Sequence, residues 1–152
     1  MPKKVDVVVI SVNSPLKIGI YAEGKLTEAI IKEGKSSDDL PLLFRDILHR
    51  YTIGRLFYTK GPGSFMAIKI AYVFLKTLSI AKKIPLFASD AFVFNGGAPI
   101  KSVGKSYFIK TDSGIEIKKL DEVLPMEFNL PAHLDVTLFS KDVKPMYIAP
   151  AV

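Results

Sequence analysis

The stretch Lys60-Gly61-Pro62-Gly63-Ser64-Phe65 lies between a short apolar segment, residues 56–58, and a long one, residues 65–83. Two glycines and a proline are typical of a tight turn, because glycine adopts positive φ at little cost. Ser64 is a favourable N-cap for a helix that begins at Phe65. The stretch therefore predicts a strand, a turn and a helix, whose N-terminal N–H groups could hold an anion or a partner's loop.

The turn matches neither of two common phosphate-binding motifs. A Walker A loop needs a lysine directly after its second glycine, whereas Ser64 follows Gly63. In the dinucleotide-binding pattern, Met66 occupies the position of the third glycine. A purely structural turn and a binding turn therefore both remain open.

The segment 65–83 is expected to form a helix of about five turns. Its polar side chains share one narrow arc, which consists of Lys69, Tyr72, Lys76, Ser79 and Lys83. The apolar remainder is wider than the stripe of roughly 100° that an ordinary surface helix buries. Either this helix is central in its own domain, or its second flank contacts another chain. Ala67 and Ala71, one helical turn apart, would permit close backbone contact there.

A preceding helix is expected over residues 38–51, with capping residues at 36–38. Its apolar side chains have i, i+3, i+4 spacing and are Leu40, Leu43, Phe44, Ile47, Leu48 and Tyr51. Leu42 lies off this stripe and would be exposed in a monomer. One exposed leucine adds only a little to the case for an interface.

Composition narrows the class of protein. The 152 residues include 49% hydrophobic residues and no cysteine, which excludes disulfides, thiolate metal ligands and a cysteine nucleophile. His49 and His133 are the only histidines, so a histidine-rich metal site is poorly supported. A net charge of +6 at pH 7 would suit an acidic or nucleic-acid partner, although the lysines are scattered. No apolar run has the length of a membrane span or of a signal-peptide core, so we expect a cytoplasmic protein.

The order of elements predicts a mixed sheet. Antiparallel strands are expected at residues 5–12, 17–21 and 26–32, and further strands at 56–58 and 85–88. Three meandering strands followed by helix, strand, helix and strand predict an α/β fold with helices on the faces of the sheet. Right-handed crossovers would place the last two strands beside the first.

The pattern weakens after Asp90. Residues 95–99 form a cluster of helix and strand breakers, and residues 106–110 and 115–118 predict a hairpin. We therefore expect an α/β domain over residues 1-95 and a reduced C-terminal subdomain over residues 96-152, mostly of short strands and loops.

The stretch from Lys60 to Ala88 resembles the TsaB family, also called YeaZ, which takes part in making threonylcarbamoyladenosine in tRNA. The motifs that carry the resemblance are Gly61-Pro62-Gly63-Ser64-Phe65, Ile68-Lys69-Ile70-Ala71 and Pro85-Leu86. The tail Lys144-Pro145-Met146-Tyr147-Ile148 is similar to that family's Pro-x-Tyr-Leu signature. The resemblance covers about residues 5 to 95. It implies an actin-like, ribonuclease-H-like mixed β-sheet with helices on its faces, plus a reduced second subdomain.

The chain departs from the family pattern at several positions. Ser11 stands where many actin-like proteins have an acid that helps to position a metal-bound nucleotide. The family's Thr-Gly pair is Met66-Ala67, its helix arginine is Lys69, and its next glycine is Ala71. The second subdomain, about residues 96 to 143, is shorter than in other members.

The resemblance implies a non-catalytic accessory subunit that binds a TsaD-type transferase, with a TsaE-type ATPase joining them. We also expect contact with tRNA only through that complex, a homodimer when the partner is absent, and no membrane. The predicted partner-binding residues are Leu43, Ile47, Gly61, Pro62, Gly63, Ser64, Phe65, Ala67, Lys69, Ala71 and Phe74.

Two other functions remain open. An enzyme would need a nucleophile and a base, and Ser64 is already explained as an N-cap. A nucleotide-binding protein or weak ATPase is the better alternative, with Asp90 as the remaining carboxylate and ATP or ADP at a subunit junction. We expect no catalytic residue, no metal site and no intrinsically bound cofactor.

Direct binding of tRNA is a further alternative. The residues that would contact its phosphates are Lys76, Lys82, Lys83, Lys101 and Lys105.

Overall fold

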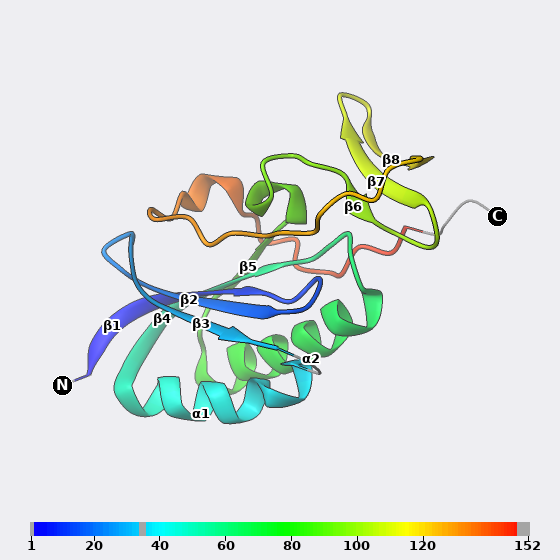
Figure 1. Cartoon of the computed structure of the whole chain (residues 1–152). Helices are drawn as coiled ribbons and strands as arrows, with labels where there is room; N and C mark the ends of the chain where they lie inside the picture. The colour runs from blue at the N-terminus through cyan, green and yellow to red at the C-terminus, as the bar shows by residue number, and fades with distance from the viewer. Residues whose placement is uncertain (1, 34–35, 149–152) are drawn as a thin grey trace.

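The computed structural model describes residues 2–33 and 36–148, which form a larger and a smaller β-sheet (Figure 1). The larger sheet has the order β3-β2-β1-β4-β5. Its strands are β1 (Lys3–Ile10), β2 (Leu16–Ala22), β3 (Lys25–Lys32), β4 (Tyr51–Thr59) and β5 (Leu86–Ser89). β1 pairs antiparallel with β2 and parallel with β4, and β5 pairs parallel with β4. The predicted mixed sheet is confirmed, except that the last strand lies beside β4 and not beside β1.

The two long helices, α1 (Leu40–Arg50) and α2 (Phe65–Lys82), lie on the same face of this sheet (Figure 1). The rings of Phe44 and Phe74 join them, with centroids 5.3 Å apart. The crossovers from β3 to β4 and from β4 to β5 run in the same direction across the sheet. Two right-handed crossovers in one direction place both helices on one face. The expectation of helices on both faces is therefore wrong.

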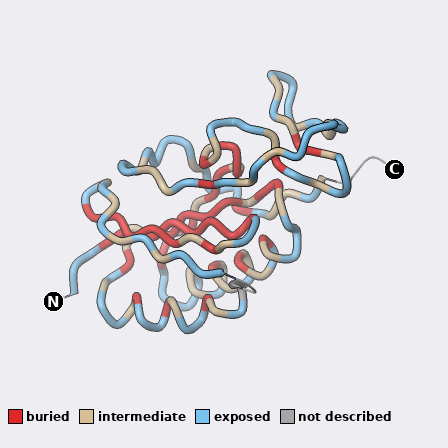
Figure 2. The backbone as a smooth tube through the Cα atoms, viewed as in Figure 1, coloured by how far each residue is buried: buried red, intermediate tan, exposed pale blue. Residues whose placement is uncertain are grey.

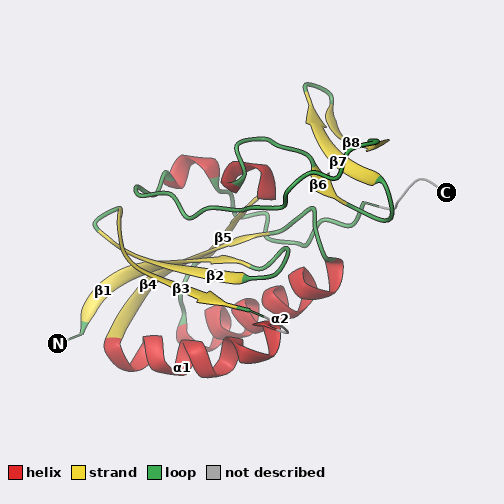
Figure 3. Cartoon of the chain, viewed as in Figure 1, coloured by secondary structure: helices red, strands yellow, loops and turns green. Residues whose placement is uncertain are grey.

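The opposite face is covered by the C-terminal half of the chain, which consists mostly of loops (Figure 3). It includes two short 3-10 turns, η2 (Ala91–Phe94) and η3 (Val136–Leu138). Phe139 packs edge-on against Phe57 of β4, with ring centroids 4.8 Å apart. Ser140 exchanges backbone hydrogen bonds with Ala88 at the edge of β5. This cover buries the second face of the sheet, and the buried residues concentrate in its central strands (Figure 2).

The smaller sheet has the order β6-β7-β8, with strands β6 (Ile100–Lys101), β7 (Ser106–Thr111) and β8 (Gly114–Lys119). The predicted hairpin is therefore present. Lys110 of β7 links it to the larger sheet, because its ammonium lies 2.6 Å from a carboxylate oxygen of Asp90, just after β5. A domain boundary at residue 95 stays a prediction, since part of the C-terminal half packs on the larger sheet.

Helix α1 begins at Leu40, two residues later than the sequence predicts. Residues Ser36–Asp39 form a 3-10 turn, η1, and Asp39 is the N-cap of α1 without a side-chain capping bond. The expected caps at 36–38 thus lie one to three residues before the N-cap. Within residues 2–33 and 36–148, no helix is long and apolar enough to cross a membrane.

The edge strand β3 is tied to the end of α1 by an ion pair. Arg50 donates to both carboxylate oxygens of Glu28, at 2.7 and 3.0 Å, and the Tyr51 hydroxyl also donates to Glu28. These hydrogen bonds, with Arg50 first, lower the pKa of Glu28 below its ordinary value. The stabilisation is therefore present above the unfolded-state pKa of Glu28 and is lost as the pH falls through its lower folded-state pKa.

We expect Glu28→Gln to lower the free energy of unfolding at pH 7 by less than about 1 kcal/mol, because the pair is partly exposed. The difference from wild type should shrink toward pH 3. Urea unfolding at both pH values measures this. An equal difference at both would show that the loss does not depend on the charge of Glu28.

Candidate functional site

The glycine turn joins β4 to α2 and packs against the chain that follows β1. The backbone N–H of Ser64 donates to the carbonyl of Val12 at 2.8 Å. Gly63 lies so close that a Cβ there would be 2.6 Å from the same carbonyl oxygen. The Ser64 hydroxyl accepts from the N–H of Ala67 at 3.4 Å, which confirms Ser64 as the N-cap of α2. Close packing is thus a sufficient reason for glycine at position 63.

The backbone around the turn is also bonded to β5 and η2. Lys60 N–H donates to the carbonyl of Ser89 at 2.9 Å, and Ala91 N–H donates to the carbonyl of Gly61 at 2.8 Å. Together with the bond from Ser64, these contacts fix the turn between β1 and β5. They favour a structural joint over an anion-binding loop.

The C-terminal segment passes over the same joint. Met146 N–H donates to the carbonyl of Lys60 at 2.7 Å, and the Lys60 ammonium donates to the carbonyl of Asp142 at 3.2 Å. The Tyr58 hydroxyl donates to the carbonyl of Val143. Burial raises the pKa of Tyr58, so this hydroxyl keeps its proton. The C-terminal segment thus fixes the position of the Lys60 ammonium group.

A row of large apolar side chains is exposed on α2. Met66, Val73 and Ile80 are spaced by seven residues and are 67%, 54% and 68% exposed. Seven residues are close to two helical turns, so the three side chains lie along one face. A groove of about 510 Å³ follows part of this row and is lined by Met66, Lys69, Ile70, Val73, Phe74 and Thr77. These seven positions and the first-turn residues Phe65 and Ala67 make up the α2 face, which consists of residues 65, 66, 67, 69, 70, 73, 74, 77 and 80.

The predicted partner-binding residues divide into two groups. Those with accessible surface are Leu43, Gly63, Ser64, Phe65, Ala67, Lys69 and Phe74. The others are buried: Ile47, Gly61, Pro62 and Ala71. Ile47 and Ala71 are 0% exposed and belong to the hydrophobic core beneath α1 and α2. Because a partner cannot reach these four positions in the folded chain, we remove them from the contact set.

Sequence reasoning missed part of the exposed surface. Met66, Val73 and Ile80 were visible as a seven-residue repeat, which is the signal that could have identified them. Tyr147, 69% exposed, packs edge-on against Phe65 with ring centroids 5.1 Å apart. No local pattern links these two residues, because they are far apart in the sequence.

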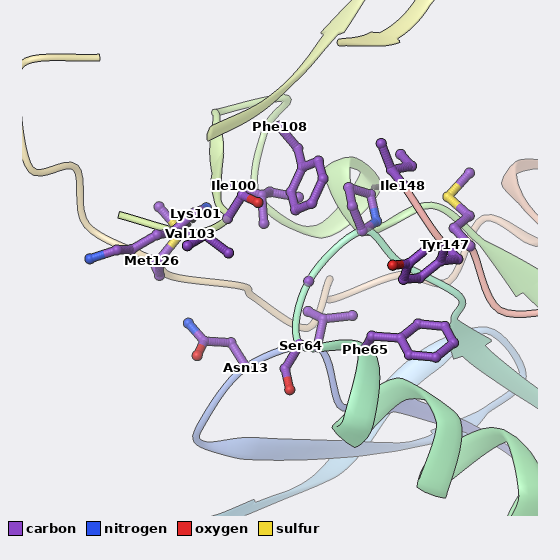
Figure 4. A pocket seen from close by; sticks show the side chains of 15 residues that line it. Asn13, Ser64, Phe65, Ile100, Lys101, Val103, Phe108, Met126, Tyr147 and Ile148 are labelled. Atoms are coloured by element: carbon purple, nitrogen blue, oxygen red, sulfur yellow. Dashed lines mark hydrogen bonds between the residues drawn. The ribbon is translucent and has the colours of Figure 1, made fainter. Parts of the chain in front are cut away.

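A cavity of about 530 Å³ lies between the glycine turn, β6, β7 and the C-terminal segment (Figure 4). Val12 and Asn13 line it from the link between β1 and β2, and Ser64 and Phe65 from the start of α2. Most other lining side chains are apolar. Among the described residues that line it, Lys101 alone carries a formal charge.

The side chains with a possible catalytic role are buried or bonded to other groups. Ser11 is 3% exposed and belongs to the interior. One oxygen of Asp90 pairs with Lys110, and the other is buried without a partner, as is the Thr59 hydroxyl oxygen. In the described part of the chain, no group of three or more acidic or histidine residues could hold a metal ion.

These features define an α/β protein with a five-stranded mixed sheet, two helices on one face and an apolar outer helix surface. No family model and no curated protein matches the sequence. Among solved structures, the chain is similar to YeaZ from Pseudomonas aeruginosa, with a TM-score of 0.56 and 14% identity over 82% of this chain and 72% of that one. It is similar to the same extent, over 71% of the other chain, to an uncharacterized protein described as resembling peptidase YeaZ from Pseudomonas aeruginosa. The fold is therefore YeaZ-like, and the actin-like assignment stays a prediction.

Proposed function

We propose that this chain is a non-catalytic accessory subunit that binds a TsaD-type transferase and supports threonylcarbamoyl modification of adenosine in tRNA. The observation that carries the proposal is the α2 face, with its exposed row of Met66, Val73 and Ile80. The YeaZ-like fold supports the choice of partner.

The α2 face has the properties of a surface that packs against another helix. Apolar side chains at seven-residue spacing fit the seam of a helix pair. Burial of such surface contributes roughly 25 cal/mol per Å², less the cost of association. The same face would form a homodimer when the partner is absent, because a two-fold contact uses one patch twice. On α1, Leu42 is 67% exposed and Leu43 is partly buried against the core.

A role without catalysis agrees with how the polar groups are used. Ser64 caps α2, Lys60 binds the C-terminal segment and Asp90 pairs with Lys110. Each of these three side chains therefore has a structural role. We propose that a TsaE-type ATPase joins the complex, that tRNA is contacted through it, and that the protein acts in the cytoplasm.

Reconstituted threonylcarbamoyl transfer tests this function. The TsaD-type and TsaE-type proteins of the same organism would be assayed on tRNA with and without this chain. We expect transfer to depend on the chain and to saturate at one equivalent per transferase. Equal rates in both mixtures would contradict the accessory role.

The second candidate is a nucleotide-binding protein, and the cavity beside the glycine turn is the observation that favours it. Within residues 2–33 and 36–148, its lining provides one lysine and no carboxylate for a magnesium ion. We therefore favour the accessory subunit as the function. In that role, ATP or ADP would bind at a junction with a partner protein, and the partner would supply the carboxylate ligands for magnesium.

A further inference from the structure

We infer that the cavity of Figure 4 binds a small organic acid that has an apolar body and a single negative charge, such as a medium-chain carboxylate. This site lies beside the α2 face, with which it shares Phe65. The inference goes beyond the accessory role and does not depend on it.

The size and walls of the cavity fit such a ligand. Its volume of about 530 Å³ falls within the range of roughly 300 to 1,000 Å³ that is common for small-molecule sites. Its apolar walls come from β6, β7 and two loops, and include Ile100, Val103, Phe108, Met126, Met146 and Ile148. Two methionines allow the walls to adapt to ligands of different shape, because their side chains are unbranched and polarizable. Contact with these walls would therefore remove part of an apolar body from water.

The polar groups of the cavity limit the charge of the ligand. Lys101 lies at one side, next to Val103 and Met126, and the Tyr147 hydroxyl lies at the other (Figure 4). The positive end of the α2 dipole, at Phe65, has the same sign as Lys101. The described lining residues include one cation and no acid, which suits one carboxylate. A triphosphate with magnesium carries more charge and needs oxygen ligands for the metal, which this lining does not supply.

Binding of decanoate, measured by isothermal titration with the full chain, tests the inference. We expect wild type to bind decanoate and not to bind ADP with magnesium at the same concentrations. Val103→Asp places a negative charge in the wall and should weaken decanoate binding by about tenfold or more. Lys101→Met removes the cation and should weaken it by up to about fivefold, the range for exposed ion pairs.

Two matched variants act as controls. Val73→Asp makes the same change on the α2 face, at a valine of similar exposure, and should leave decanoate binding within about twofold, since it lies outside the cavity. Lys105→Met removes a lysine outside the lining and should have no larger effect. Val103 is 67% exposed, so its replacement should leave the fold intact, which circular dichroism checks.

Each other outcome overturns the inference. Failure of decanoate to bind would show that the cavity is not such a site. Binding of ADP with magnesium in place of decanoate would assign the cavity to a nucleotide. A loss on Val73→Asp equal to that on Val103→Asp would place decanoate elsewhere. Because none of these measurements includes the transferase, failure of the accessory role would leave the result unaffected.

Discussion

Replacement of Val73 with glutamate is expected to weaken the complex with the TsaD-type transferase by about 100-fold or more. Val73 lies in the middle of the α2 face and lines its groove. A carboxylate buried there in an apolar contact would lack a partner, and an unpaired buried charge costs several kcal/mol. Titration calorimetry or surface plasmon resonance measures the dissociation constant. The monomer should keep its stability, because the Val73 side chain is more than half exposed.

A matched control separates this contact from general effects of charge. Ile31 on the edge strand β3 is 59% exposed and lies outside the α2 face. Ile31→Glu should leave the affinity within about twofold, as expected of a position outside the interface. Unchanged affinity of Val73→Glu would exclude the α2 face as the contact. Ala71, buried in the core, is unsuitable for this test because a large charged residue there would disrupt folding instead.

Gly63→Ala is expected to lower the free energy of unfolding by about 1 to 3 kcal/mol, as in other overpacked sites. The new Cβ would lie 2.6 Å from the Val12 carbonyl oxygen and 2.7 Å from the Val12 Cβ. The carbonyl cannot move away without loss of its hydrogen bond from Ser64 N–H. Urea unfolding monitored by circular dichroism measures the change in the transition midpoint.

Gly54→Ala is the matched control, because this glycine lies in the same strand–turn–helix unit, within β4. Its new Cβ would meet the end of the Lys4 side chain, which is exposed and can move aside. We expect a change of less than about 0.5 kcal/mol, the usual range for surface substitutions. A Gly63→Ala protein as stable as wild type would contradict the close packing of the turn against Val12.

The strands of the larger sheet and the two long helices followed from the sequence because their apolar patterns are regular, although β5 pairs with β4 and not with β1. Alternation predicts half-buried strands, and the run of β-branched residues in β1 predicts a strand buried on both faces. The C-terminal half could not be predicted in the same way. Its contacts, such as Phe139 against Phe57, join distant residues without periodic structure. Cover of the second sheet face by loops was therefore missed, and helices were expected there.

The site was predicted in part for a related reason. α2 is apolar on nearly every side, so its sequence indicates an excess of apolar surface but not which side is buried. Ala71 was expected at an interface and lies in the core, whereas Met66 and Ile80 lie outside. Only the tertiary structure fixes the rotation of the helix on the sheet, through contacts such as that of Phe74 with Phe44.

Light scattering of this chain mixed with the TsaD-type protein of the same organism tests the central claim most directly. The accessory role predicts a single species whose mass is the sum of one copy of each protein, formed at the expense of any homodimer. Two separate species with the masses of the unmixed proteins would contradict the role of this chain as a subunit of that complex.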